Sequence, residues 1–242
     1  MHQQSLPKVT DLFFLYRPDT YRFFFYHFDQ FMKFKKITLS VLKVEQKNYT
    51  CQATINRPEA HNAINFAVMD ALEELLTDIE EDNHTRCLIL RGAGTNAFIS
   101  GGDLGEFHTI KTAKDAKPMA ERMGSILQRI EMLPCWTIAS VNGPSYGGGC
   151  EIMLAFDFRI ASSEAIFGFT QGKFYLPPGW GGLTRLVERV GRSTALRWLA
   201  ETAVIDAEEA LAHTLIDKKT SADILDQQTM SWAYDLCHNG RD

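Results

Sequence analysis

Three consecutive glycines at positions 147–149 open a helical pattern, and they constrain the fold of this chain more than any other feature. They are followed by Cys150, Glu151 and the apolar run 152–156. Because glycine has no Cβ, the backbone N–H groups at this helix start are open to a ligand, and the local field there favours negative charge. The pattern is typical of a site for a developing oxyanion, with Glu151 near enough in sequence to act as an acid or base. A glycine turn that only packs a strand tightly on a helix is the alternative.

Length and composition limit the class of protein. The chain has 242 residues, of which 45% are apolar, and this predicts one globular body with a sizeable core. A net charge of −5 with both signs scattered lacks the basic surface that nucleic-acid binding requires. The five cysteines are odd in number, widely spaced and without the spacing of a metal site. We therefore expect a cytoplasmic protein with no metal site and no nucleic-acid partner.

Residues 1–31 differ from the rest of the chain. Two aromatic runs, 12–16 and 23–28, are separated by charged residues and proline. Each run is shorter than the ~20 apolar residues of a membrane span, and no small-residue cleavage site follows a basic start. We expect no membrane span, and we interpret 1–31 as an extension that precedes a start at Met32 and a single domain over 32–242. The alternative is an aromatic arm that docks on the body or on a neighbouring subunit.

The spacing of apolar residues predicts the regular elements. Alternation of apolar and polar residues predicts an antiparallel hairpin over 37–44 and 49–55. Apolar residues at helical spacing after Asn65 predict a helix that this residue caps, and short apolar runs that end in glycine turns predict buried strands. The expected helices are 66–81, 116–132, 183–190 and one that starts at the capping box 206–209, and the other expected strands are 87–90, 136–141, 158–161 and 165–169. Strand, turn and helix recur, which predicts one α/β body.

Four separated segments resemble the crotonase family, that is, the enoyl-CoA hydratase and isomerase superfamily. These segments are 56–65, 97–104, 140–151 and 178–186, and they occur in the order that the family has. The resemblance implies an α/β fold built as a spiral of repeated ββα units. It also implies a lyase or isomerase of fatty acid metabolism that forms a homotrimer or hexamer. The substrate would be an acyl-CoA thioester, with no cofactor apart from the CoA that the substrate carries.

The resemblance also assigns roles to individual residues. The backbone N–H groups of Gly102 and Gly148 would hold the thioester oxygen as it becomes an enolate, and Glu151 would be the acid or base. Asp103 is interpreted as an acceptor that fixes its loop, and Cys150 as a small packing residue. The remaining residues expected to contact the substrate are Ala60, His61, Ala63, Ser100, Gly101, Asp103, Leu104, Tyr146 and Gln171. For Tyr146, packing is weighed against lining the acyl pocket or donating a proton.

One departure from the family bears on the reaction. Hydratases of the family carry two glutamates; the first matches Glu151, but the second position holds Gln171. Glutamine can orient a water but exchanges no proton at neutral pH. We therefore expect isomerisation of a double bond, or loss of CO2 from a malonyl-type thioester, at least as readily as hydration. An acyl-CoA-binding protein without turnover and a structural, trimer-forming subunit are the alternatives.

Two other departures concern the last third of the chain. Thr214 stands where the family has a glycine, and a left-handed residue without glycine costs about 1 kcal/mol. The chain continues for only a short distance after Asp217. The resemblance therefore implies a shortened C-terminal helical part, with less cover over the acyl-CoA pocket.

Overall fold

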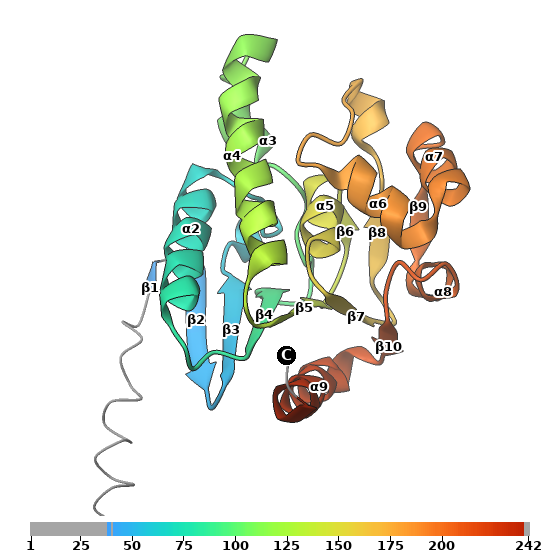
Figure 1. Cartoon of the computed structure of the whole chain (residues 1–242). Coiled ribbons are helices and arrows are strands. Elements are labelled where there is room, and N and C mark those ends of the chain that lie inside the picture. The colour runs from blue at the N-terminus through green and yellow to red at the C-terminus, as the bar shows by residue number, and fades with distance from the viewer. Residues whose placement is uncertain (1–37, 40, 240–242) are drawn as a thin grey trace, which may run out of the picture. The chain divides into compact units, whose positions relative to one another are not determined.

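A seven-stranded sheet is the base of the computed structural model, which describes residues 38–39 and 41–239 (Figure 1). Its strands, in spatial order, are β1 (Thr38–Leu39), β2 (Leu42–Lys47), β3 (Thr50–Ile55), β4 (Cys87–Gly92), β5 (Trp136–Val141), β7 (Phe158–Ser162) and β10 (Lys218–Thr220). The strands from β3 onward are parallel to one another. A second sheet contains β6 (Ser145–Tyr146), β8 (Ile166–Gly168) and β9 (Val204–Asp206). Helices and a parallel sheet confirm the predicted α/β class.

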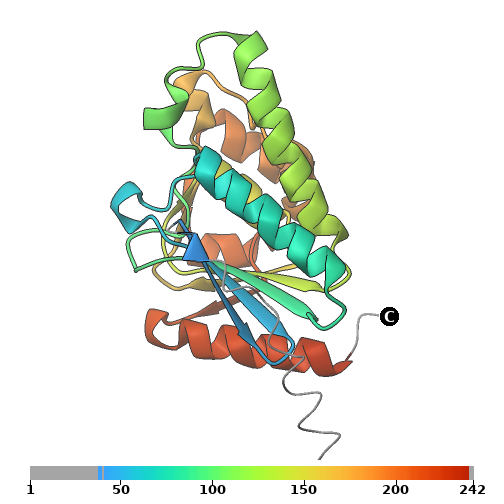
Figure 2. The same ribbon diagram turned by 90° about the vertical axis from the view of Figure 1, so that its left-hand side faces the viewer.

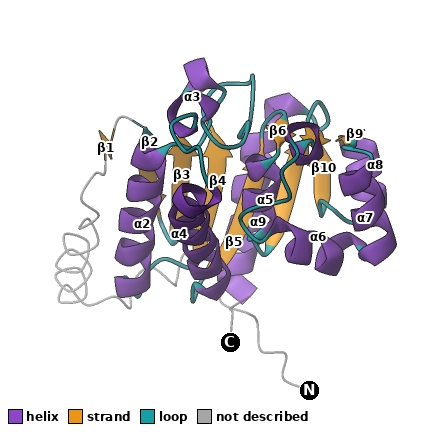
Figure 3. Cartoon of the chain, turned by 90° about the horizontal axis from the view of Figure 1, so that it is seen from above, coloured by secondary structure: helices purple, strands orange, loops and turns teal. Residues whose placement is uncertain are grey.

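Helices cover both faces of the larger sheet. Figure 2 shows α2 (Phe66–Glu81) and α4 (Ala113–Met132) on one face and α9 (Leu225–Asn239) on the other. The other described helices are α3 (Leu104–Phe107), α5 (Gly148–Leu154), α6 (Gly182–Val190), α7 (Arg192–Ala200) and α8 (Ala207–Ala212). Short 3-10 turns span η2 (Pro58–Ala60), η3 (Gln171–Phe174) and η4 (Ala222–Ile224). Seen from above in Figure 3, α5 lies between α4 and the helices α6 to α8.

The side chains of β4 explain why both faces are covered. Leu88 and Leu90 belong to the main core with α2 and α4, whereas Cys87 and Ile89 belong to a smaller cluster with α9. Successive residues of a strand point to opposite faces, so an uninterrupted apolar run needs apolar cover on both sides. The run 87–90 predicts a buried strand, which the structure confirms as β4.

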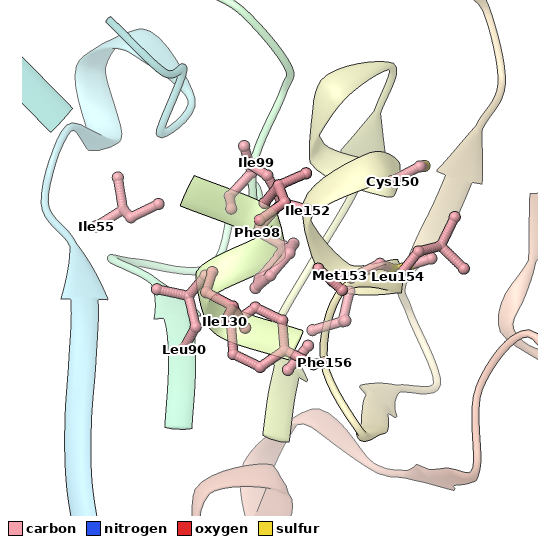
Figure 4. Packing of buried hydrophobic residues seen from close by; sticks show 14 of the residues in the cluster. Ile55, Leu90, Phe98, Ile99, Ile130, Cys150, Ile152, Met153, Leu154 and Phe156 are labelled. Carbon is pink, nitrogen blue, oxygen red and sulfur yellow. The ribbon is translucent and has the colours of Figure 1, made fainter. Parts of the chain in front are cut away.

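The main core lies between the sheet and α5. Figure 4 shows Leu90 of β4, Ile130 of α4 and Ile152 of α5 meeting there, and each is at most 2% exposed. Six of the seven residues of α5 are buried. The helix that begins within the glycine triplet is thus held mainly by apolar contacts, with Glu151 as its buried charged residue.

Several predicted boundaries are confirmed and others are corrected. The structure has helix 66–81 and strand 136–141 as predicted, and Asn65 Oδ1 accepts a hydrogen bond of 3.0 Å from Val68 N. The predicted first strand is wrong in its extent, because it forms two pieces, β1 and β2, that pair with each other. The hairpin turn also lies later than predicted, at Asn48 and Tyr49, because Asn48 adopts a left-handed conformation (φ 54°) that suits a tight turn.

Other features lie outside the described residues or were not predicted from the sequence. Residues 1–31, interpreted as an extension, lie outside the described residues, so that boundary stays a prediction. Helices α7 and α9 have no counterpart among the predicted elements. Thr214 adopts a left-handed conformation (φ 59°) without being glycine, and its Oγ1 donates to Arg189 O over 3.1 Å.

A buried asparagine fixes the loop that follows β4. Asn62 is fully buried, and its Nδ2 donates to Ala93 O (3.0 Å) and Ala97 O (2.9 Å). Asn142 supports the start of the same loop, because its Oδ1 accepts from Gly92 N over 3.0 Å. Buried backbone groups need such partners, so these amides set the path of the chain toward the second glycine turn.

We predict that Asn62→Ala lowers the free energy of unfolding by about 3 kcal/mol, because the buried carbonyl of Ala97 and the partly buried carbonyl of Ala93 lose their donor and Arg57 N loses its acceptor. Denaturant titration followed by circular dichroism measures this change. The matched control is Asn83→Ala at an exposed position, which we expect to change stability by less than about 0.5 kcal/mol. Equal effects of the two substitutions would contradict this account.

Candidate active site

The two glycine turns lie side by side in the structure. A parallel bridge joins Ile99 to Ser145, and Tyr146 N donates to Ile99 O over 3.1 Å. A Cβ on Gly101 would lie 3.4 Å from the backbone nitrogen of Gly148. Segments 97–104 and 140–151, which are far apart in sequence, therefore meet as the resemblance predicts.

The amides predicted to bind a thioester oxygen are open. Within the described part of the chain, the N–H groups of Gly102 and Gly148 donate no hydrogen bond. Gly148 is the first residue of α5, where an N–H group has no partner inside the helix. The next residue has to be glycine as well, since a Cβ on Gly149 would overlap the carbonyl oxygen of Ile99. The arrangement can accept an anionic oxygen.

Glu151 lies on the first turn of α5 and is 4% exposed. Its Oε1 accepts from Gly179 N (3.2 Å) and from Gln171 Nε2 (3.4 Å). Its Oε2 accepts from Trp180 N (2.8 Å) and Gly182 N (2.9 Å). All of these partners are donors, so the geometry matches an ionised carboxylate at the start of α6.

Two opposing influences act on the pKa of Glu151. Burial raises the pKa because it penalises the charged form, while hydrogen bonds from Trp180, Gly182, Gln171 and Gly179 lower it. Burial is the stronger influence, and the pKa lies above its ordinary value. A proton can bind only where one of these donors is released. The carboxylate is therefore both a proton site and the support of a loop.

Gln171 lies next to Glu151, at the position expected for a second carboxylate. Its amide nitrogen donates to Glu151, while its Oε1 is buried and has no hydrogen-bond partner among the described residues. A Cβ on Gly147 would lie 3.9 Å from Gln171 Cδ, so the carboxamide also borders the glycine turn. This oxygen is an acceptor without a partner among the described residues, and it borders the glycine triplet.

The loops expected to hold CoA are adjacent to each other. Ser100 N donates to His61 O over 3.1 Å, and Ser100 Oγ lies 3.5 Å from Ala60 O. His61 is exposed, Ala63 is buried, and Leu104 is 66% exposed at the start of α3. The structure therefore brings these residues together at one edge of the site. Among the described residues, no hydrogen bond joins His61 to Glu151.

Asp103 joins the same two loops. Its Oδ2 pairs with Arg57 Nη2 over 2.8 Å, and its Oδ1 accepts from Glu106 N at the start of α3. Burial alone would raise the pKa of Asp103, but Arg57 and the backbone N–H groups of Glu106 and Gly105 outweigh it and lower the pKa. An ionised carboxylate with an ion pair on one oxygen and a hydrogen bond on the other fixes the loop, which is the role that the sequence suggested.

Tyr146 and Cys150 pack beside the turn. The ring of Tyr146 lies against Gly168, where a Cβ would overlap it. Cys150 is fully buried, its Sγ donates to Ser145 O over 3.2 Å, and burial raises the pKa of its thiol to about 12. A thiol in this state is unreactive.

Sequence reasoning placed Trp180 in a segment that resembles the family but predicted no contact between this residue and the glycine turns. The structure places its indole ring next to both Gly102 and Gly148. The signals in the sequence were its place in the family-like segment 178–186 and an aromatic side chain among glycines.

Membrane-spanning helices and metal-binding clusters can both be judged for the part of the chain that the structure describes. None of its helices is long and apolar enough to cross a membrane. None of its clusters brings together three or more His, Cys, Asp or Glu side chains in positions to hold a metal ion.

Comparison with known proteins identifies the family. The sequence model described as enoyl-CoA hydratase/isomerase matches residues 45–242. The chain is 36% identical over 175 residues to a short-chain-enoyl-CoA hydratase of Clostridium acetobutylicum, a match that covers 72% of this chain and 67% of that protein. It is 35% identical over 164 residues to the ethylmalonyl-CoA decarboxylase of Bos taurus, covering 68% of this chain and 53% of that protein. Matches to these relatives thus span from about half to two thirds of their length.

Solved structures agree. The enoyl-CoA hydratase of Bacillus anthracis superimposes with a TM-score of 0.80 at 30% identity, covering 83% of this chain and 78% of that one. Fold and site together define an α/β protein of the crotonase type, with paired glycine turns and one buried glutamate. The chain belongs to the enoyl-CoA hydratase/isomerase family, as the sequence motifs predicted.

We predict that Glu151→Gln weakens the hold on the backbone amides at the start of α6, because the carboxamide has one acceptor oxygen in place of two and carries no charge. Hydrogen exchange of Trp180 and Gly182 should become at least about tenfold faster. The control is Glu188→Gln on the exposed side of α6, which should leave these two rates unchanged. Unchanged exchange in Glu151→Gln would show that the carboxylate does not support this loop.

Proposed function

We propose that this chain is an acyl-CoA enzyme that stabilises a thioester enolate with the N–H groups of Gly102 and Gly148. These donors lie on adjacent turns, and neither is used inside the described part of the protein. Preorganised donors aimed at a developing oxyanion contribute about 3 to 4 kcal/mol each to the stability of the transition state. Relatives named as enoyl-CoA hydratases and ethylmalonyl-CoA decarboxylases support a CoA thioester as the substrate.

The reaction that the site supports best is loss of CO2 from an alkylmalonyl thioester. The bond from the α carbon to the carboxylate breaks, its electron pair moves into the thioester to give the enolate, and CO2 leaves. A proton then adds to the α carbon, which yields the saturated acyl-CoA. Formation of this enolate needs no base, which suits a site where Glu151 already accepts hydrogen bonds from Gly179, Trp180, Gly182 and Gln171. The choice depends on one observation, which is that both oxygens of the Glu151 carboxylate already accept two hydrogen bonds.

Glu151 has a role in the second half of this reaction. Its raised pKa favours binding of a proton from the solvent, which the carboxyl group passes to the α carbon of the enolate when a hydrogen-bond donor is released. Hydration would demand more, because a water must be both oriented and deprotonated. Gln171 can only orient it. The geometry thus favours decarboxylation first, a proton shift between carbons second, and hydration last.

The remaining parts of the proposal follow the family. The loops that carry Ala60, His61 and Ala63, and Ser100, Gly101, Asp103 and Leu104, would contact the CoA, with Tyr146 and Gln171 near the acyl group. The CoA arrives with the substrate, and no step described above draws on another cofactor. Assembly as a homotrimer or hexamer, a cytoplasmic location and a place in fatty acid metabolism stay predictions, as does the alternative of acyl-CoA binding without turnover.

The test offers the pure protein crotonyl-CoA, a 3-enoyl-CoA, methylmalonyl-CoA and ethylmalonyl-CoA, with products followed by mass spectrometry. We expect saturated acyl-CoA and CO2 from the malonyl thioesters and little hydration of crotonyl-CoA. Glu151→Gln should lower turnover by about 10²- to 10⁴-fold, the usual contribution of a proton-transfer group.

Each of the other possible results would support a different function. Rapid hydration of crotonyl-CoA would contradict the weight given to Gln171. Conversion of only the 3-enoyl thioester would indicate an isomerase. Binding of every thioester without any product would favour the non-catalytic alternative.

A further inference from the structure

We propose that Trp180 determines which acyl groups reach the glycine pair, an inference that rests on the function proposed above. A Cβ on Gly148 would overlap the six-membered part of the indole, and a Cβ on Gly102 would lie 3.7 Å from its Cζ2. The ring therefore extends from one glycine to the other. Trp180 is 6% exposed, so the ring is packed in this place and does not move freely in solvent.

The backbone of Trp180 is held on both sides. Its N–H donates to Glu151 Oε2 over 2.8 Å, and its carbonyl accepts from Arg185 Nη1 over 2.8 Å. Arg185 is itself fixed by two hydrogen bonds of 2.7 Å to the carboxylate of Glu131 on α4. Paired, charge-assisted bonds of this kind are strong and directional. The indole is a fixed wall and Glu151 is one of the residues that position it.

A cavity of about 400 Å³ lies on the α4 side of this loop. Trp180 contributes to its lining together with charged side chains that include Lys117 and Glu131, whereas neither glycine of the pair lines it. Trp180 thus borders the charged cavity and also touches the glycine pair. The indole thus lies between the glycine pair and a space lined partly by charged side chains.

The position of the ring has a consequence for the substrate. A thioester oxygen bound to Gly102 and Gly148 is two bonds from the α carbon, which places this carbon and its substituent within reach of a ring that packs against both glycines. One methylene too many or too few in an apolar pocket changes specificity by about 10- to 200-fold. The bulk of the indole therefore limits the size of the α-substituent, and short alkyl groups are the ones that fit.

The test measures the affinity of the full chain for unreactive thioesters with increasing branching at the α carbon. Calorimetry would compare propionyl-CoA, isobutyryl-CoA and 2-ethylbutyryl-CoA. For Trp180→Ala, we expect the affinity for 2-ethylbutyryl-CoA relative to propionyl-CoA to rise by at least about tenfold. Trp180→Leu keeps apolar bulk without the indole plane, so it should shift the ratio in the same direction even where the alanine variant folds poorly.

Leu183→Ala provides the matched control, because Leu183 lies three residues further on and is 43% exposed. It should leave the ratio unchanged. Folded Trp180→Ala or Trp180→Leu protein with the wild-type order of affinities would overturn the proposal.

A second measurement separates this inference from the proposed function. Wild-type protein and both Trp180 variants are given methylmalonyl-CoA and isopropylmalonyl-CoA, and CO2 release is followed. Binding of the saturated series with no CO2 from either malonyl thioester contradicts decarboxylation, while the affinity ratio still decides the role of Trp180. Failure of the wild-type protein to bind any thioester would contradict both proposals.

Discussion

The carboxylate of Glu151 connects segments that are distant in sequence. It starts on α5, directly after the glycine triplet, and accepts from the backbone at Gly179, Trp180 and Gly182. A negative charge at the start of α6 is favourable because the first N–H groups of a helix have no internal partner. The first turn of α5, the loop before α6 and the wall formed by Trp180 are thereby held in one arrangement. The open amides of the site depend on that arrangement for their surroundings.

This support conflicts with proton transfer. A general base works best when its lone pairs are free, whereas each oxygen of Glu151 already accepts two hydrogen bonds. Burial raises the pKa and these donors lower it, so the site balances the two forms of the carboxyl group. Chemistry that creates an enolate without a base avoids the conflict, since the carboxylate can stay bonded during the first step and exchange a proton only in the second.

Short sequence patterns predicted much of the fold, because helix caps and apolar periodicity depend on residues that are close in sequence. The cap at Asn65 and the apolar run 136–141 gave the bounds of α2 and β5, and the glycine motifs gave the family. The split of the first strand was missed because pairing between β1 and β2, not alternation, decides where each begins. The place of Trp180 was missed for a similar reason. Its contact with Gly148 arises from packing between residues 32 positions apart, which no local period reveals.

The side-chain amide of Gln171 donates a hydrogen bond to Glu151 and favours the ionised form of its carboxyl group. Gln171 Nε2 lies 3.4 Å from Glu151 Oε1, so a glutamate in its place would bring two carboxylates together in a buried pocket. Like charges at that distance cannot both ionise, and one group would be held in its protonated form. A glutamine instead donates to Glu151 and helps to keep it ionised, which preserves the bonds to Trp180 and Gly182. The amide at position 171 thus supports, through its bond to Glu151, the loop that carries Trp180 against the glycine pair.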